Sequence, residues 1–233
     1  MKPLRLKQII FYIVIFIILW GLFSASIATI TKDHTLGTDF YVFHLAGKYT
    51  FLESKNPYSN DLGSEAQIAI LGRLANPGED KLGFAYPLYS LFLIYPLIYL
   101  LFSWSQAIWM SFLILLIITV LNYISSNAKP WLTLSVLFFY PFSFRILLGN
   151  YVILISCILL ILFYFFFSQN NISISQQIIL GIFLAWCTIK PQFIWLYIIL
   201  LIFSSVKKRY KWFNLSFFFS DIIIYPFIIL YTR

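Results

Sequence analysis

The run IIFYIVIFIILWGLFSASIATI, residues 9–30, is the stretch that decides the fold class. It contains no charged side chain over its whole length. About 20 consecutive apolar residues form a helix long enough to cross the hydrocarbon core of a bilayer. A secretory signal peptide has a shorter apolar core of about 7–15 residues. Residues 1–30 are therefore predicted to form a retained first transmembrane helix.

The whole chain has the composition of a membrane protein. Hydrophobic residues make up 61% of its 233 residues and charged residues only 10%, whereas soluble domains carry about 25% charged residues. The apolar runs have the length of helices and lack the alternation of a membrane β-barrel. The sequence therefore predicts an all-α, polytopic bundle of membrane helices, with residues 1–233 as a single integral membrane domain.

The basic residues are placed as in a multi-pass protein with a cytoplasmic N-terminus. The net charge is +8, and the cations gather in KPLRLK (residues 2–7) and KKRYK (residues 207–211). Positive charge near the ends of membrane helices stays on the cytoplasmic side. These clusters do not form the basic stripe of a nucleic-acid-binding protein, so no nucleic-acid partner is expected. We expect a plasma-membrane location.

A polar region, residues 31–83, follows the first helix and is predicted to lie outside the cytoplasm. It carries seven of the eight acidic residues. Two short helices are expected in it. The first runs from about Asp39 to Ser54 and ends at Asn56-Pro57, and the second runs from about Ser64 to Ala75. As amphipathic pieces, they are expected to lie along the membrane surface.

The remainder, residues 84–233, is predicted to be transmembrane helices with short connections. The apolar stretches are residues 84–102, 107–124, 131–148, 151–167, 177–189, 193–206 and 213–231. Residues 177–206 could form one long helix broken at Lys190-Pro191, or a hairpin whose Lys-Pro turn faces outward. The hairpin is preferred because it places Asn150 and Lys190 on the side of Asp39. It requires that one earlier stretch, such as 84–102 with its two prolines, does not cross fully.

Charged side chains inside apolar runs are candidates for function, because each costs about 2.5–3.5 kcal/mol on insertion scales. Three such residues are Arg145, Lys190 and Asp221. Each could instead extend its polar end to the membrane interface. Asp39 could be a structural acid, since carboxylates at helix N-termini are favoured by the helix dipole. Cys157 and Cys187 lie in apolar runs without ligand-like spacing, so neither a metal site nor a disulfide is expected.

Several segments, in order, resemble one family of membrane enzymes. They are TDFYVFHLAGKYTFLESKNPYS (38–59), FAYPLYSLFLIYPL (84–97), RILLGNYVILI (145–155), TIKPQFIWLYIILL (188–201) and KKRYKW (207–212). A first helix followed by an outward loop with an Asp-Phe pair resembles the entrance of GT-C glycosyltransferases. The wider pattern is similar to glycosyltransferase family 87, the polyprenyl-phosphate-mannose-dependent group also filed as DUF2029.

The chain departs from the pattern of family 87 in three respects. The family often has Gly-Gln-x-Asn where this chain reads Gly149-Asn150-Tyr151-Val152, and Tyr-Pro-Pro where it reads Tyr86-Pro87-Leu88. Family members also continue well past this length. A C-terminal truncation, a split gene product and a degenerate copy therefore remain open as explanations.

The resemblance implies a GT-C-like fold and a hexosyltransferase. A hexose, with mannose as the first expectation, would move from a polyprenyl-phosphate donor to a hydroxyl of a lipid or glycan acceptor. The transfer would invert the anomeric centre at the extracytoplasmic face. Asp39 would be the base, and Arg145 and Lys190 would bind the departing phosphate. Tyr41, Tyr58, Tyr86 and Asn150 would contact substrate, and no cofactor or metal is expected.

Two other readings fit the same residues. A transporter or flippase for a lipid-linked intermediate would use Arg145 and Lys190 as anion guides along its path. A truncated, non-catalytic remnant of the family would fit the short chain. Transfer activity separates the enzyme from both alternatives.

Overall fold

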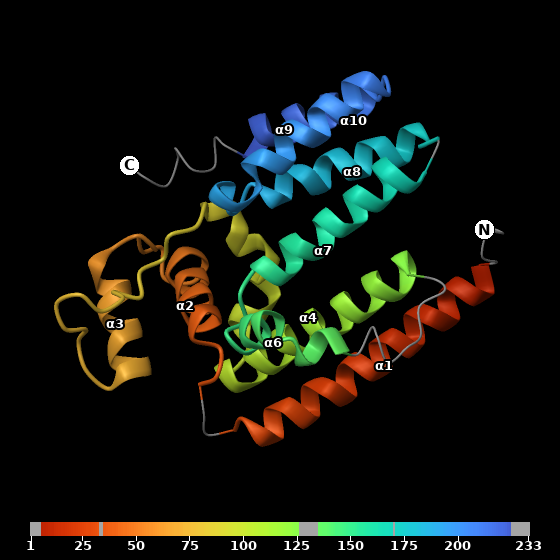
Figure 1. The fold of residues 1–233 in the computed structure, drawn as a ribbon. Coiled ribbons are helices and arrows are strands. Elements are labelled where there is room, and N and C mark those ends of the chain that lie inside the picture. Colours follow the sequence, from red (N-terminus) through yellow and green to blue (C-terminus); the bar gives the residue numbers. More distant parts are fainter. Residues whose placement is uncertain (1–5, 33–34, 126–134, 170, 225–233) are drawn as a thin grey trace.

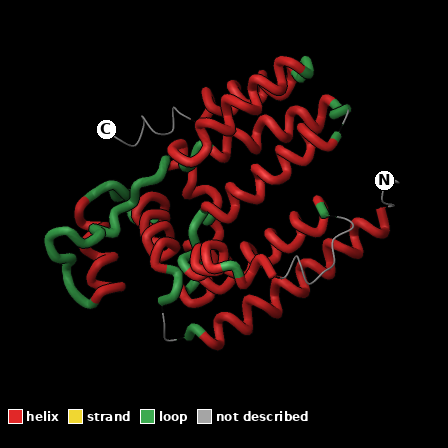
Figure 2. Tube along the Cα trace, in the orientation of Figure 1, coloured by secondary structure: helices red, strands yellow, loops and turns green. Residues whose placement is uncertain are grey.

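The computed structural model describes residues 6–32, 35–125, 135–169 and 171–224. Every secondary-structure element in these ranges is helical, as Figures 1 and 2 show. The predicted all-α class is therefore confirmed. Long helices lie side by side on one side of the molecule in Figure 1, and the shorter α2 and α3 lie beyond their ends.

Two helices of the described residues, α1 (Leu6–Ile30) and α4 (Phe102–Ile124), are long and apolar enough to cross a membrane. They pack against each other through polar as well as apolar contacts. Trp20 Nε1 donates a hydrogen bond to Ile108 O at 3.0 Å, and the hydroxyls of Ser24 and Ser111 are 2.7 Å apart. These bonds satisfy groups that an apolar environment would leave unpaired.

The two short helices of the polar region form, but one prediction about them was wrong. Helix α2 (Thr38–Phe51) is not an amphipathic piece with one exposed face, because residues from Phe40 to Thr50 are mostly buried. It packs against α3, α4 and the segment that follows α3. At Gly47 a Cβ atom would lie 2.7 Å from Ile98 Cγ2, so the close contact requires glycine. Helix α2 is thus an internal element of the fold.

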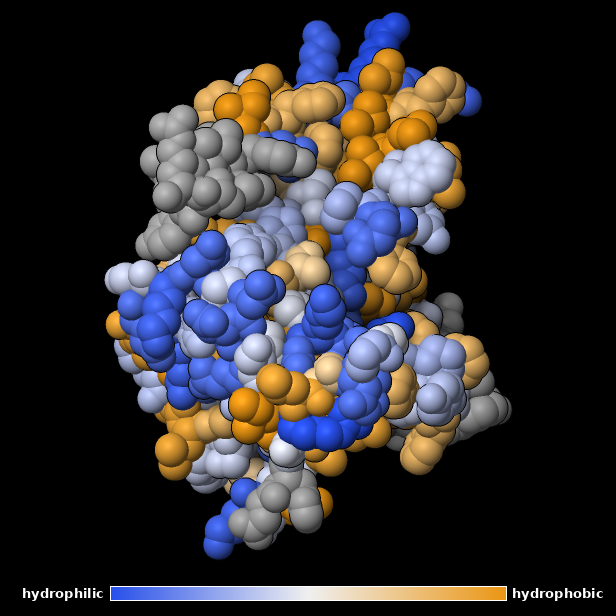
Figure 3. Space-filling view, turned by 90° about the vertical axis from the view of Figure 1, so that its left-hand side faces the viewer, coloured by the Kyte–Doolittle hydropathy of each residue, from blue (hydrophilic) through white to orange (hydrophobic). Residues whose placement is uncertain are grey.

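Helix α3 (Asn60–Leu71) begins and ends about four residues before its predicted bounds. Ser59, with an extended backbone, precedes it, and Gly72 follows it in the left-handed conformation with φ +70°. Glycine adopts this conformation without steric cost and commonly ends a helix. The stop at Gly72 therefore comes before the Asn-Pro-Gly that the prediction used. In Figure 3, hydrophilic residues gather on the face that carries α3 and its loops.

Residues 84–102 do not form a membrane-spanning helix. They form two short 3₁₀ helices, η1 (Leu88–Leu93) and η2 (Tyr95–Tyr99), which begin next to Pro87 and Pro96. Proline lacks the N–H group that a continuous helix needs. This is the non-crossing stretch that the hairpin interpretation requires.

The stretch predicted at 131–148 is a short helix in its described part. It contains η3 (Val136–Phe138) and α6 (Tyr140–Leu147), and residues 131–134 lie outside the described residues. A helix as short as α6 extends only about 12 Å, so it does not reach across a bilayer. Its last turn carries Arg145.

The remaining helices are α7 (Val152–Phe163, continued by the π-helical turn Tyr164–Ser168), α8 (Ile174–Cys187), α9 (Pro191–Lys207) and α10 (Lys211–Ile224). Two contacts fix the direction of α9. Lys190, before its first turn, bonds Asn150 before α7, and Lys208, after its last turn, donates to Phe166 O at the far end of α7. Helix α9 therefore runs parallel to α7, and α8, which comes between them in the chain, runs in the opposite direction. Residues 177–206 therefore form a hairpin and not one long helix, whereas the outward direction of its Lys-Pro turn stays a prediction.

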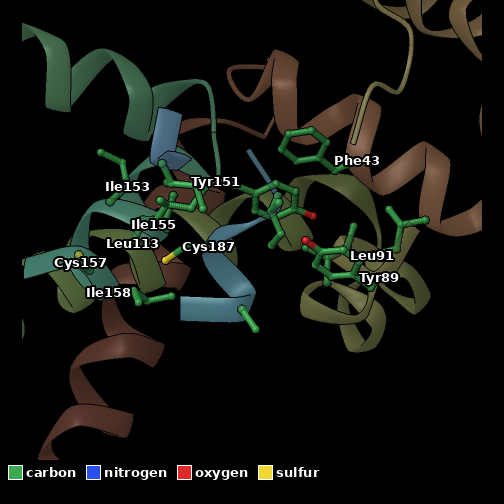
Figure 4. Close-up of a cluster of buried hydrophobic side chains, with 14 of the residues drawn as sticks. Phe43, Tyr89, Leu91, Leu113, Tyr151, Ile153, Ile155, Cys157, Ile158 and Cys187 are labelled. Carbon is green, nitrogen blue, oxygen red and sulfur yellow. The ribbon is translucent and has the colours of Figure 1, made fainter. Parts of the chain in front are cut away.

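The interior is continuous from α2 into the long helices. The ring of Phe43 stacks on Tyr151 with centroids 4.2 Å apart. Figure 4 shows this pair beside Ile153, Ile155, Cys157 and Ile158, which follow along α7. The buried end of α7 thus connects the core of α2 to that of the long helices.

The contact between α8 and α10 depends on Gly181. A Cβ atom there would lie 2.4 Å from Phe213 O and 2.0 Å from Ser216 Oγ. Replacing Gly181 by alanine should destabilise the protein by about 1–3 kcal/mol through overpacking, measured as a lower Tm in detergent. The matched control is Gly21→Ala in α1, where no atom lies within 4 Å. Equal melting of the two variants would contradict the packing described.

Candidate functional site

A buried amide connects one acid and one cation from distant parts of the chain. Asp39 lies in the first turn of α2, Asn150 in the turn between α6 and α7, and Lys190 directly before α9. Asn150 Nδ2 donates to Asp39 Oδ2. Lys190 Nζ donates to Asn150 Oδ1 at 3.1 Å. The structure therefore brings together three residues that the sequence analysis assigned to one site.

The turn that carries Asn150 is docked directly on the start of α2. Phe40 N donates to Leu148 O at 3.0 Å, and Trp109 Nε1 donates to Gly149 O at 2.7 Å. Gly149 has φ +67°, and a Cβ atom on it would lie 2.6 Å from Phe40 Cβ. Only glycine tolerates both the left-handed backbone and this approach. The turn is therefore held where Asn150 meets Asp39.

The interruption of the helix at Lys190-Pro191 positions the ammonium group of Lys190. Lys190 has φ −126° and ψ 76°, outside the helical region, and Pro191 is the first residue of α9. A proline disfavours the helical conformation of the residue before it. Lys190 therefore stays outside the helical conformation directly before α9, and its side chain bonds Asn150. The residue is only 8% exposed.

Both polar atoms of the Asn150 amide are bonded within the protein. Nδ2 donates to Asp39, and Oδ1 accepts from Lys190 and also from Val152 N at 2.9 Å. Asn150 is 2% exposed. It was expected to contact substrate, but here it acts as a neutral link between two charged groups. Among the described residues, no direct ion pair joins Asp39 to Lys190.

Tyr86 lies between the acid and the cation. Lys190 Nζ lies 4.9 Å from the centroid of its ring, a cation–π distance. Burial and, second, the charge of Asp39 raise the pKa of the Tyr86 phenol above its ordinary value of 10.0. The phenol therefore stays protonated at neutral pH. Tyr58 Oη donates to Tyr86 O at 2.8 Å and fixes the backbone at this point.

Arg145 supplies a second positive charge beside this cluster. Its charge acts on both Tyr86 and Lys190, yet no hydrogen bond or ion pair joins its side chain to another described residue. Burial lowers the pKa of Lys190, Asp39 opposes this effect and Arg145 adds to it. His44, also buried, has its pKa lowered to about 4 mainly by burial, so it is neutral at pH 7. The cluster thus combines one acid with two cations.

Two predicted residues are placed elsewhere. The ring of Tyr41 packs edge-on against Phe102 with centroids 4.9 Å apart, and Tyr41 lines neither of the cavities at the cluster. Asp221 lies in α10, and its Oδ1 is buried without a partner among the described residues. No contact of Asp221 with the cluster is present in the described part of the chain.

Two cavities meet at Tyr86. The first, here called the cationic cavity, has a volume of about 550 Å³; it is lined by Tyr58, Ala85, Tyr86, Pro87, Ile189, Lys190, Pro191 and Gln192. The second, the acidic cavity, has a volume of about 210 Å³; it is lined by Asp39, Val42, Phe43, Asp80, Leu82, Gly83, Ala85 and Tyr86. Sequence reasoning did not single out Asp80, because it is one of several acids in an exposed loop and nothing local marks it.

A third cavity is apolar and lies among the long helices. Its volume is about 240 Å³, and its lining residues are Leu93, Leu116, Leu154, Cys157, Ile158, Ile161, Phe183 and Trp186. Leu154 lies one helical turn after Asn150, and Trp186 lies one turn before Lys190. The apolar cavity therefore begins four residues from Asn150 along α7 and four residues before Lys190 at the end of α8.

Removing the Asn150 amide should weaken the fold as well as the site. In Asn150→Ala, buried Lys190 loses its acceptor, which costs about 1–3 kcal/mol and should lower the Tm in detergent by at least about 3 °C. Asn171→Ala is the matched control, since Asn171 is exposed. A melting temperature equal to that of the control would show that the hydrogen bonds of Asn150 do not contribute to the free energy of unfolding.

Comparisons with known protein families, with curated proteins and with solved structures find no significant match to this chain. Support for a function therefore comes from the residues of the cluster and from the cavities around it.

Proposed function

We propose that this chain is a multi-pass membrane glycosyltransferase that moves a hexose, with mannose as the first candidate, from a polyprenyl-phosphate donor to an acceptor hydroxyl. The observation that carries the proposal is the buried amide of Asn150, which bonds both the carboxylate of Asp39 and the ammonium of Lys190, with the charge of Arg145 acting on Lys190. Resemblance to glycosyltransferase family 87 across the segments that hold these residues also favours it.

Asp39 is the proposed base. An acceptor hydroxyl has a pKa far above neutrality, so it needs a positioned group to take its proton during attack. Asp39 Oδ2 accepts from Asn150, whereas Oδ1 receives no hydrogen bond from another described residue. The carboxylate is thus oriented by one oxygen while the other remains for the acceptor in the acidic cavity.

Lys190 and Arg145 are the proposed partners of the leaving group. The acceptor oxygen forms a bond to the anomeric carbon as its proton passes to Asp39. The bond from that carbon to the phosphate oxygen breaks, and the lipid phosphate departs with the electron pair. Its growing negative charge is stabilised by cations placed in advance, and the Arg145 guanidinium can donate two parallel bonds. Attack opposite the leaving group inverts the anomeric centre.

The apolar cavity favours a donor with a lipid tail. It is lined by side chains of α4, α7, α8 and η1 and lies about one helical turn from Asn150 and Lys190. Helix α4 is long and apolar enough to cross a membrane. A donor could therefore place its phosphate at Lys190 while its chain follows the apolar helices. In this proposal the cluster lies at the extracytoplasmic surface of the plasma membrane.

The same cations would also serve a flippase for lipid-linked intermediates. The apolar cavity beside Lys190 is the observation that favours this second candidate. A flippase has no need of a base, however, so it leaves the oriented Asp39 carboxylate without a role. Transfer of label to an acceptor separates the two candidates, because a flippase moves the lipid and leaves its sugar in place.

Asp39→Asn should lower kcat for transfer at least 100-fold, because general base catalysis contributes about 10²–10⁴-fold. The measurement uses a radiolabelled polyprenyl-phosphate hexose and purified protein in nanodiscs. Binding of the donor should be unchanged, since the asparagine keeps the shape of the side chain. Asp61→Asn, at an exposed position of α3, is the control. Full turnover in Asp39→Asn would remove this residue from the mechanism.

Sidedness can be tested at the two ends of α9. Gln192 lines the cationic cavity, and Lys208 follows the far end of the helix. A membrane-impermeant maleimide should label Gln192→Cys in intact cells, and Lys208→Cys only after permeabilisation. Both native cysteines are buried, so the background should be low. The opposite pattern would place the cluster in the cytoplasm and contradict the proposed location.

A further inference from the structure

The two cavities at the cluster carry opposite charge. Lys190 is the charged residue that lines the cationic cavity, and no acid lines it. Asp39 and Asp80 line the acidic cavity, and no Lys or Arg lines it. They share Ala85 and Tyr86 as a common wall. Anions are therefore favoured on one side of Tyr86 and disfavoured on the other.

The wall between the cavities is held from several directions. Tyr58 Oη bonds the backbone of Tyr86, and the Tyr86 ring contacts Phe43 and Tyr151 edge-on, with centroids 4.7 and 5.6 Å apart. The ring contacts and the backbone hydrogen bond therefore position Tyr86 where the two cavities meet.

Asp80 is positioned by bonds within the loop that contains it. Its Oδ1 accepts from Leu82 N at 2.9 Å, and no other described residue bonds Oδ2. Arg73 closes the loop with two bonds to Glu79, at 2.8 and 2.9 Å. The hydrogen bonds from Arg73 are the main cause of the lowered pKa of Glu79, which is about 2. The ion pair between Arg73 and Glu79 therefore stays charged at neutral and mildly acidic pH. Asp80 is thus held at the cavity with one oxygen unused.

We propose that the acidic cavity binds an uncharged, hydroxyl-bearing acceptor, such as a neutral sugar ring, and that Asp80 binds and selects it. This inference rests on the proposed function. Asp39 and Asp80 each keep one carboxylate oxygen without a described partner, and such oxygens accept hydrogen bonds from hydroxyls. Asp80 holds a neighbouring hydroxyl while Asp39 takes the proton of the reacting one. The cavity volume of about 210 Å³ equals that of about seven waters, which suits one ring.

Selection against anions follows from the same charges. An acceptor with its own carboxylate would be repelled by Asp39 and Asp80, with no cation lining the cavity to offset the repulsion. The donor phosphate is favoured on the other side of Tyr86, where Lys190 lines the cationic cavity. Asp80 is therefore a specificity-determining residue, and its removal should weaken the preference for a neutral acceptor.

The test compares an alkyl hexoside with the matching alkyl hexuronide, which differs by a carboxylate at C6. With a radiolabelled polyprenyl-phosphate hexose, kcat/KM should be at least tenfold higher for the hexoside. Asp80→Asn should reduce the ratio of the two kcat/KM values, hexoside over hexuronide, at least threefold. It should also raise KM for the hexoside without changing KM for the donor. Asp61→Asn, also an exposed acid of the same region but outside the cavity lining, should leave the ratio unchanged.

Binding of the two acceptors, measured by calorimetry without donor, makes the result independent of turnover. If the protein binds the hexoside more tightly than the hexuronide, and Asp80→Asn reduces that difference, the inference is supported even when no transfer occurs. In that case only the proposed function fails. Transfer or binding without a charge preference, or a ratio unchanged in Asp80→Asn, would overturn the inference while leaving the transferase intact. Failure of both ligands to bind would also overturn it.

Discussion

The contact between the start of α2 and the turn before α7 is the constraint on which the site depends. One backbone hydrogen bond, from Phe40 N to Leu148 O, and one glycine, Gly149, bring the two segments together. The glycine has a left-handed backbone and no room for a Cβ atom, so this approach is specific to that residue. Asn150 follows directly, and it could not reach Asp39 if the turn were displaced.

A neutral amide between two charges has a different energetic consequence from a direct ion pair. Burying an ion pair costs desolvation energy that its attraction does not always repay, and the pairing leaves both groups occupied. Here Asn150 satisfies one oxygen of Asp39 and the ammonium of Lys190 without joining them. Both charges remain oriented and separate, and Tyr86 lies against the cation. Such an arrangement suits a site where base and anion-binding groups act on different atoms.

The positions of the short elements explain why the cluster has access from outside the bundle. Helices α1 and α4 are long and apolar enough to cross a membrane, whereas the segment before α4 forms only the short 3₁₀ helices η1 and η2, which begin next to prolines. The segment between Gly83 and Pro87, directly before η1, forms walls of both cavities. Polar loops on one side of it and an apolar cavity on the other give the region two chemically different surroundings.

Local signals in the sequence determined the helical class, the acid in the first turn of α2 and the break at Lys190-Pro191. These features depend on apolar run length and on the backbone restrictions of proline, which act within a few residues. The sequence placed α3 about four residues late because Gly72 and Ser59, not the Asn-Pro-Gly, set its ends. Only the tertiary structure decided that α2 is buried, that Asn150 joins Asp39 to Lys190, and that Asp80 shares a cavity with Asp39. Asp39 is 111 residues from Asn150, and Lys190 is 40 residues beyond it. Contacts over such separations follow from how the helices pack, which no short pattern of residues contains.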